Sequence, residues 1–242
     1  MLNLIHGEIY RLLHKKSLYI YFGILLAGYF LITFVRSGGF DAGSVLDDST
    51  TYFNFFPALA GGFLFAAIYT DDLNAKNLIT LVGYGLNKTK IVFAKLILGV
   101  AFSALFFGLL PLVHCGFYAL LGHEATASQM TNVYIVSFKY FLLTVAFFAI
   151  SSIVVYGLQR TTFAIVTYIL LAFNVIGSLV LMVVNVLKLN IAEYLLSNLT
   201  DKILLSLAAG DSIVMPLLGC LVYVAIAVTL SAIVFHKKEM EF

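Results

Sequence analysis

The sequence predicts an all-α membrane protein that crosses the bilayer several times. Apolar residues make up 62% of the 242-residue chain and charged residues only 11%, against about 45–50% and about 25% in soluble domains. A soluble fold of this size cannot bury so much apolar surface, so lipid must cover part of it. The apolar residues form continuous runs without strand-like alternation, which excludes a transmembrane β-barrel. The composition also excludes a soluble enzyme, a nucleic-acid-binding protein and a disordered chain.

Six apolar runs are predicted to be membrane spans, because a helix needs about 20 such residues to cross about 30 Å of hydrocarbon. The runs are 18–35, 52–69, 91–121, 133–158, 161–186 and 213–235, and they form a single domain over residues 1–242. The third run is longer than one span, so we expect it to tilt or to extend into water. Broken helices are not expected, because Pro111 is the only proline deep within a run.

The distribution of Lys and Arg predicts the orientation. Six spans place both chain ends on one side, and that side carries ten of the 14 basic residues. The positive-inside rule therefore predicts that both termini lie in the cytoplasm. The N-terminal segment is not expected to be a cleaved signal peptide, because Glu8 interrupts its basic lead and the run that follows is long.

Residues 1–17 are predicted to form an amphipathic helix in the cytoplasmic interface. Their apolar positions repeat at helical spacing and basic residues gather near the end of the segment. We expect Ser17 to separate this helix from the first span. The alternative is a polar extension of that span, with Lys15 and Lys16 reaching back to the interface.

The cytoplasmic loop 70–90 is predicted to contain a second short helix, over residues 73–82. Asp71 and Asp72 are suited to cap its start, and glycine at 83 and 85 to end it. The helix would expose Leu78 and Leu81. Such an apolar face needs either the lipid headgroup layer or the groove of a partner protein.

Residues 187–211, outside the cell in this topology, are predicted to form one or two amphipathic helices. Leucine or isoleucine recurs every fourth residue from Ile191 to Leu207, while Glu193, Asp201 and Lys202 occupy other faces. These charges make the segment too polar to span. It would either lie on the outer surface or re-enter the outer leaflet where protein buries it.

The chain lacks the residue patterns of catalysis and of cofactor binding. The stretch from Gly83 to Thr89 has Asn87 where a phosphate-binding loop needs its last glycine. No His, Cys or acidic pattern has the spacing of a metal site. The spans contain few ionisable residues, His114 and Lys139 being the candidates. We expect most uncharged polar residues in the spans to join helices.

Asn174, Ser178 and Asn185, all on the fifth run, either line a transport path or serve the same packing role.

The order of these parts resembles a known family. The local sequence that carries the resemblance runs from Asp71-Asp72 through Lys76 and Leu78 to Lys88 and on to Ala94-Lys95 at the start of the third run. This is similar to the cytoplasmic loop of ABC-2 type transporter permeases. Those permeases often have a Ser-Arg pair at the position where this chain has Asn87-Lys88. The small size resembles permeases that export antimicrobial peptides, such as lantibiotics, or confer immunity to them.

The resemblance implies a membrane subunit of an ATP-driven exporter that moves an amphipathic or hydrophobic substrate. Two copies of a separate ATPase subunit would bind ATP and Mg²⁺, this chain would bind no cofactor, and a second permease subunit would complete a homodimer or heterodimer. The resemblance implies three groups of site residues: an ATPase-coupling group of Asp71, Asp72, Asn74, Lys76, Leu78, Leu81 and Lys88; a path lined by Asn174, Ser178 and Asn185; and an extracellular gate of Glu193, Leu195, Leu199 and Asp201.

Two other functions stay open from the sequence. An ion-coupled secondary transporter would depend on His114 or Lys139. A membrane scaffold or assembly protein would need no ATPase partner.

Overall fold

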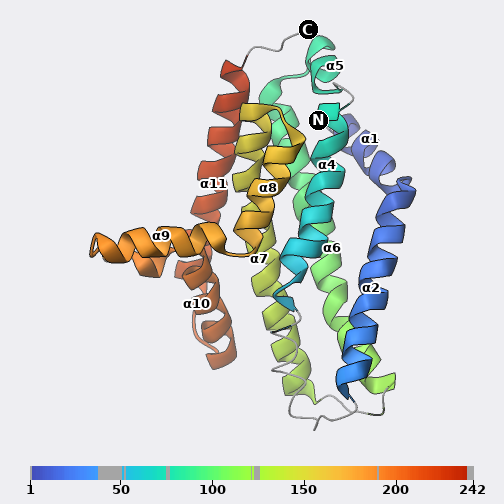
Figure 1. The fold of residues 1–242 in the computed structure, drawn as a ribbon, viewed down its shortest axis with the longest axis vertical. Helices are drawn as coiled ribbons and strands as arrows, with labels where there is room; N and C mark the ends of the chain where they lie inside the picture. The colour runs from blue at the N-terminus through green and yellow to red at the C-terminus, as the bar shows by residue number, and fades with distance from the viewer. Residues whose placement is uncertain are drawn as a thin grey trace.

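The computed structural model describes residues 2–37, 51, 53–74, 77–120, 122, 126–189 and 191–238, and every regular element in these ranges is helical. Figure 1 shows most of the helices packed side by side along one axis, with α1 lying obliquely to them and α9 leaving the bundle. The all-α prediction is confirmed for these residues. The elements are α1 (Leu2–Leu13), α2 (Lys16–Ser37), the π-helix η1 (Pro57–Gly61), α4 (Gly62–Asn74), α5 (Asn77–Gly83), α6 (Lys88–Leu120), α7 (Ala127–Leu158), α8 (Thr161–Ala172), α9 (Val175–Val186), the 3₁₀ turn η2 (Ala192–Tyr194), α10 (Leu196–Ala209) and α11 (Val214–Lys237).

Four helices among the described residues are long and apolar enough to cross a membrane, namely α2, α6, α7 and α11. A fifth span results if α8 and α9 count together. Among the described residues of the run 52–69, expected to be the second span, the apolar helix covers Pro57–Tyr69, begins as η1 and is shorter than a span. The prediction of six spans is therefore not confirmed. The coarser prediction, a membrane protein with several apolar helices, is supported.

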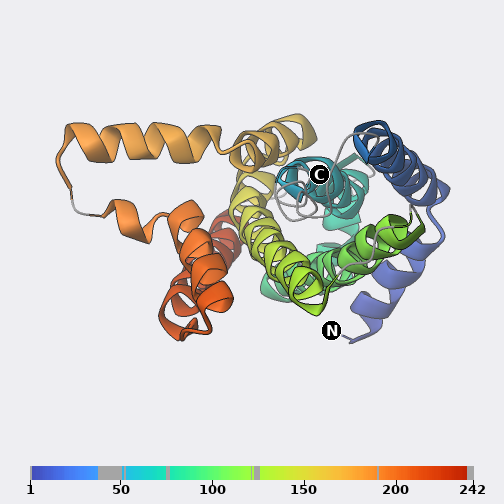
Figure 2. The same cartoon turned by 90° about the horizontal axis from the view of Figure 1, so that it is seen from below.

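The fifth predicted span is broken, and the expectation of unbroken helices is wrong at this point. Helices α8 and α9 meet at an angle of 63°. The break is at Asn174, whose φ of 57° lies in the left-handed region. Asparagine enters this region more readily than most residues, so the chain turns here without a proline. Helix α9 consequently projects sideways from the bundle (Figures 1 and 2).

Helix α7 is the central element of the packing. It contacts α6, α8, α10 and α11, and its polar side chains join it to two of them. The Ser152 hydroxyl lies 2.7 Å from that of Ser231 on α11, and the Ser137 hydroxyl donates to the Phe107 carbonyl of α6 over 2.5 Å. These contacts confirm that small polar residues join helices here.

The ends of α7 are defined by local hydrogen bonds. At its start, the backbone N–H of Thr126 donates to Gln129 Oε1 over 2.8 Å, and the N–H of Gln129 donates to Thr126 Oγ1 over 3.4 Å, which is a capping box. At its end, Gln159 adopts a left-handed conformation and the next helix begins at Thr161. The short turn expected between the fourth and fifth runs is thus present.

We predict that Gly61→Ala destabilises the fold by about 1–3 kcal/mol, as overpacking of a filled core does. A Cβ at Gly61 would overlap the hydroxyl of Tyr168, which is fully buried and donates to the Pro57 carbonyl over 2.9 Å. The matched control is Gly108→Ala on α6, where a Cβ meets nothing within 4 Å; helix propensity there favours alanine by about 1 kcal/mol. Thermal unfolding in detergent measures both variants, and equal melting temperatures would contradict the close packing at Gly61.

Candidate functional site

A polar cavity of about 140 Å³ lies between α7, the α8–α9 bend, α10 and the residues that lead into η1. Its walls bring together parts of the chain that are far apart in sequence. The lining residues are Asn54, Pro57, Lys139, Tyr140, Leu143, Phe147, Ala172, Asn174, Ser197, Thr200 and Asp201. We call this cavity the α7–α10 pocket.

An ion pair forms one wall of the α7–α10 pocket. Lys139 Nζ of α7 lies 2.5 Å from Asp201 Oδ1 of α10, and it also lies 5.2 Å from the centre of the Tyr140 ring. The Lys139 side chain is 19% exposed and that of Asp201 is 52% exposed. Charged side chains beside a membrane span are costly unless they are paired, and they commonly mark a substrate or ion path.

The bend at Asn174 and the packing of α10 position the remaining walls. The left-handed backbone of Asn174 turns the chain at the edge of the pocket. Helix α10 is fixed by Leu199 and Ile203, which are buried and form a small core cluster with Cys220 of α11. Thr200, fully buried beside them, donates to the Ser197 carbonyl over 2.8 Å. The α10 wall of the pocket is therefore polar and held in place by the core, and the opposite wall is formed by the bend at Asn174.

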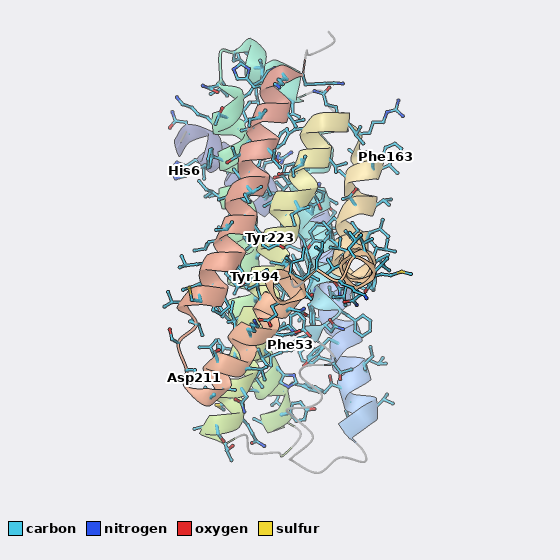
Figure 3. The ribbon with its side chains drawn as sticks, turned by 90° about the vertical axis from the view of Figure 1, so that its left-hand side faces the viewer. His6, Phe53, Phe163, Tyr194, Asp211 and Tyr223 are labelled. Carbon is cyan, nitrogen blue, oxygen red and sulfur yellow. The ribbon has the colours of Figure 1, made fainter. Side chains whose placement is uncertain are left out.

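The segment that leads into α10 carries a second ion pair outside the pocket. Lys202 Nζ lies 2.7 Å from Glu193 Oε2, and this hydrogen bond, together with the Lys202 charge, lowers the pKa of the Glu193 carboxyl below its ordinary value. The Tyr223 hydroxyl of α11 donates to the Tyr194 carbonyl over 3.0 Å, and Figure 3 shows these two labelled residues close together. Residues 193–202 are thus attached to the bundle by polar contacts as well as by the core cluster.

The structure brings only some of the predicted path and gate residues together. Asn174 and Asp201 both line the pocket, whereas Ser178 and Asn185 are exposed on α9, which projects from the bundle. Leu199 is buried against α11. The helix predicted over 187–211 begins only at Leu196, after the η2 turn, and the middle of its apolar stripe faces protein.

Most of the pocket residues were not predicted from the sequence. Lys139 was noted as ionisable and Asp201 as a gate residue, but nothing in the sequence pairs two residues that are 62 positions apart. Asn54, Ser197 and Thr200 belong to ordinary polar stretches. A signal does exist at Asn174, a residue that tolerates the left-handed backbone and stands inside a highly apolar run, but the sequence predicts only path lining or helix packing for it.

The predicted ATPase-coupling helix differs from the observed one in two ways. Asp71 and Asp72 were expected to cap a new helix, but α4 continues through them to Asn74. Lys76 lies outside the described residues. Leu78 was expected to be exposed, but it is 5% exposed and belongs to the main core cluster, with Leu81 half-buried against it. Both leucines therefore hold α5 on the bundle.

The end of α5 is the part that faces outward. Gly85, with φ 78°, ends the helix in the left-handed conformation, and the N–H of Leu86 donates to the Leu81 carbonyl over 3.2 Å. The predicted end of this helix at a glycine is confirmed. Tyr84, which lies between Gly83 and Gly85, is 83% exposed. Lys88, expected to contact an ATPase, donates to the Lys238 carbonyl over 2.8 Å at the end of α11.

Helix α1 is attached to the same end of the bundle by a buried cluster of charges. Lys95 Nζ of α6, fully buried, lies 2.8 Å from Glu8 Oε1, and Arg11 lies 2.7 Å from the same carboxyl group. Arg11 and Lys95 both donate to the Ile68 carbonyl of α4, over 3.3 and 3.4 Å. This Glu8–Lys95–Arg11 cluster joins α1, α4 and α6. Two non-helical residues, His14 and Lys15, separate α1 from α2, so α1 is not an extension of that span.

His114, the other ionisable residue expected within a span, is fully buried in an aromatic cluster. Its Nδ1 contacts the Tyr29 hydroxyl, and its ring lies 5.4 Å from Phe53 and 4.9 Å from Tyr118. Cys115 and Cys220 are free. In the part of the chain that the structure describes, no group of three His, Cys, Asp or Glu residues could hold a metal ion.

No family model, curated protein or solved structure matches this chain. The function therefore has to be argued from the α7–α10 pocket and from the end of the bundle that carries α1 and α5.

We predict that single cysteines at positions 193 and 201, in a background without Cys115 and Cys220, react with a membrane-impermeant thiol reagent added to intact cells. The replaced side chains are 74% and 52% exposed, and the orientation predicted from the sequence has this segment outside the cell. Labelling of both positions only after the cells are broken open would contradict this orientation.

Proposed function

We propose that this chain is the membrane subunit of an ATP-driven exporter of the ABC-2 type, in the plasma membrane of a bacterial cell, with both termini in the cytoplasm. The observation that supports this most is the way α5 is held. Leu78 packs into the same core cluster as Leu12 of α1 and Ile91 of α6. A helix that only tethered two spans would not need this burial.

The α5 region is suited to receive force from a separate protein. The Glu8–Lys95–Arg11 cluster links α1, α4 and α6 at the same end of the bundle. A displacement of α5 would therefore reach α4 and α6 through side chains packed at interior density, which transmits strain. An ATPase subunit docked at this end, in two copies that bind ATP and Mg²⁺, would supply that displacement.

We expect Tyr84, rather than Leu78 or Leu81, to contact the ATPase. It is 83% exposed, in a turn whose backbone is fixed by Gly85. Exposed aromatic side chains on a rigid support are frequent energetic anchors of protein interfaces. The coupling site would then consist of the tip of α5 and its turn, with the two leucines acting as internal supports.

The transported substrate is proposed to be amphipathic or hydrophobic, such as an antimicrobial peptide. The bundle exposes large apolar side chains on most of its helices, so a substrate could reach it from the lipid as well as from water. A second permease subunit, identical or different, would complete the path, and residues 193–201 would close its outer end.

We predict that Tyr84→Asp abolishes co-purification of the ATPase and leaves the chain inserted, because the charge replaces the anchor without entering the core. The matched control is Tyr10→Asp on α1, where the side chain is 66% exposed but does not belong to the α5 turn. An interface anchor is worth about 2 kcal/mol or more, so its loss weakens the complex at least about 30-fold. Leu78→Asp, by contrast, is expected to unfold the chain. Unchanged ATPase binding by Tyr84→Asp would contradict the proposed docking surface.

An ion-coupled secondary transporter is the second candidate, and the Lys139–Asp201 pair beside a broken helix favours it. Secondary transporters commonly place substrate and ion sites at such breaks. The paired state of both charges and the attached α5 helix fit the exporter better. A scaffold without transport activity would leave the α7–α10 pocket without a role.

We predict that His114→Asn retains most ATP-driven transport between pH 6 and pH 8, because the histidine serves packing inside its aromatic cluster. Transport into inverted vesicles, driven once by ATP and once by a proton gradient, provides the measurement. A loss of about tenfold or more with the folded protein intact would point to proton coupling through His114.

A further inference from the structure

The polar and apolar walls of the α7–α10 pocket are separated along the membrane axis. Lys139, Leu143 and Phe147 follow one another at four-residue steps, so they lie on one face of α7. Lys139 carries the charge, and the next two residues on this face toward Leu158, Leu143 and Phe147, are apolar. The pocket therefore has a charged end and an apolar end on the same helix face.

The charged end of the pocket lies far from the end of α7 that joins α8. Lys139 precedes Leu158, the last residue of α7, by 19 residues, which is about 28 Å along a helix that rises 1.5 Å per residue. The hydrocarbon core is about 30 Å thick. Lys139 and Asp201 therefore lie about one hydrocarbon thickness from the turn at Arg160, and Leu143 and Phe147 lie between the pair and that turn.

The charge of the pocket selects the kind of ligand that can enter it. Lys139 and Asp201 neutralise each other across 2.5 Å. A ligand with a single charge would pair with one of them and leave the other without its partner, which costs more for Lys139, 19% exposed, than for Asp201, 52% exposed. A zwitterion exchanges the internal pair for two new pairs, with its anionic group at Lys139 and its ammonium group at Asp201. The hydroxyl and amide side chains of the lining supply further hydrogen bonds to either group.

The size of the pocket limits the ligand to a headgroup. Its volume is about 140 Å³, whereas sites that enclose a whole drug-sized molecule measure about 300–1,000 Å³. A small polar group fits, and the remainder of an amphiphile would have to lie outside the cavity, along the apolar face of α7.

From the Lys139–Asp201 pair at the polar end of this pocket, we infer that the α7–α10 pocket binds the zwitterionic headgroup of an amphiphile, with an ammonium group and a phosphate or carboxylate a few bonds apart. The start of the apolar tail then packs against Leu143 and Phe147. The inference rests on the proposed function only for the outward placement of the pocket, and it requires neither ATP nor a partner subunit.

Lipid binding to the purified chain tests this inference. Phosphatidylethanolamine, anionic phosphatidylglycerol and a cationic trimethylammonium lipid, all with the same acyl chains, compete for the protein in detergent, and native mass spectrometry counts the lipids retained. We expect phosphatidylethanolamine to bind at least about tenfold more tightly than either singly charged lipid, because only the zwitterion leaves no charge unpaired.

Single neutralisations should change the preference in opposite directions. Asp201→Asn leaves Lys139 alone and should favour phosphatidylglycerol, whereas Lys139→Gln leaves Asp201 alone and should favour the cationic lipid. The double exchange Lys139→Asp with Asp201→Lys keeps a neutral pair and should keep the preference for the zwitterion. A purely structural ion pair would not produce opposite shifts, so folding defects alone cannot imitate the result.

The exposed Glu193–Lys202 pair provides the matched control. Glu193→Gln with Lys202→Gln removes a pair of similar length from the same segment but outside the pocket, and lipid preference should stay unchanged. Soluble phosphoethanolamine then separates two sources of the ligand: displacement of bound lipid indicates that the free headgroup suffices, and lack of displacement indicates a membrane lipid.

Equal retention of the three lipids by the unmodified chain would overturn the inference, as would single variants that keep the original preference. Neither result would bear on the exporter proposal, which the loss of ATPase binding by Tyr84→Asp tests separately.

Discussion

The packing of α7 against four other helices is the interaction on which the rest of the structure depends. Small and hydroxyl-bearing side chains on α7 allow α6 and α11 to approach closely, and buried Ser152 and Ser137 form hydrogen bonds across these contacts. Because lipid tails are as apolar as leucine, such close contacts contribute more to helix association in a membrane than burial of apolar area does. The α7–α10 pocket is a consequence of the same arrangement, since α10 packs on both α7 and α11.

Charges are used sparingly inside the bundle, and two ion-paired groups stand out among the described residues. The Glu8–Lys95–Arg11 cluster ties α1 to α4 and α6 at one end, beside α5. The Lys139–Asp201 pair ties α10 to α7 farther along the bundle, 12 residues from the start of α7. Lys95 is fully buried, so loss of its partner is costly there, whereas Asp201 is half exposed and its pair constrains the helices less. These two pairs connect the proposed site of ATPase action with the proposed site of ligand binding through α6 and α7.

Much of the architecture could be predicted from the sequence because hydrophobic length is a local property. The long apolar runs predict α6, α7 and α11, and the predicted ends differ from the observed ends by three residues or fewer, except at the start of α7. The break at Asn174 was missed because it depends on one residue adopting a left-handed backbone inside an apolar run. The burial of Leu78 was missed because an amphipathic pattern indicates that a helix has an apolar face and not which neighbour covers it. The pairing of Lys139 with Asp201 is a tertiary contact between distant positions, which no spacing rule reaches.

The central claim, that α10 is held on α7 by the Lys139–Asp201 pair at the pocket, is tested most directly by a double-mutant cycle on thermal stability. The cycle comprises Lys139→Gln, Asp201→Asn and the double variant, measured in lipid nanodiscs. The account predicts a coupling free energy of about 1 kcal/mol or more between the two positions, as for residues in direct contact. Additive effects of the two substitutions would contradict it, because they would show that the two charges do not interact.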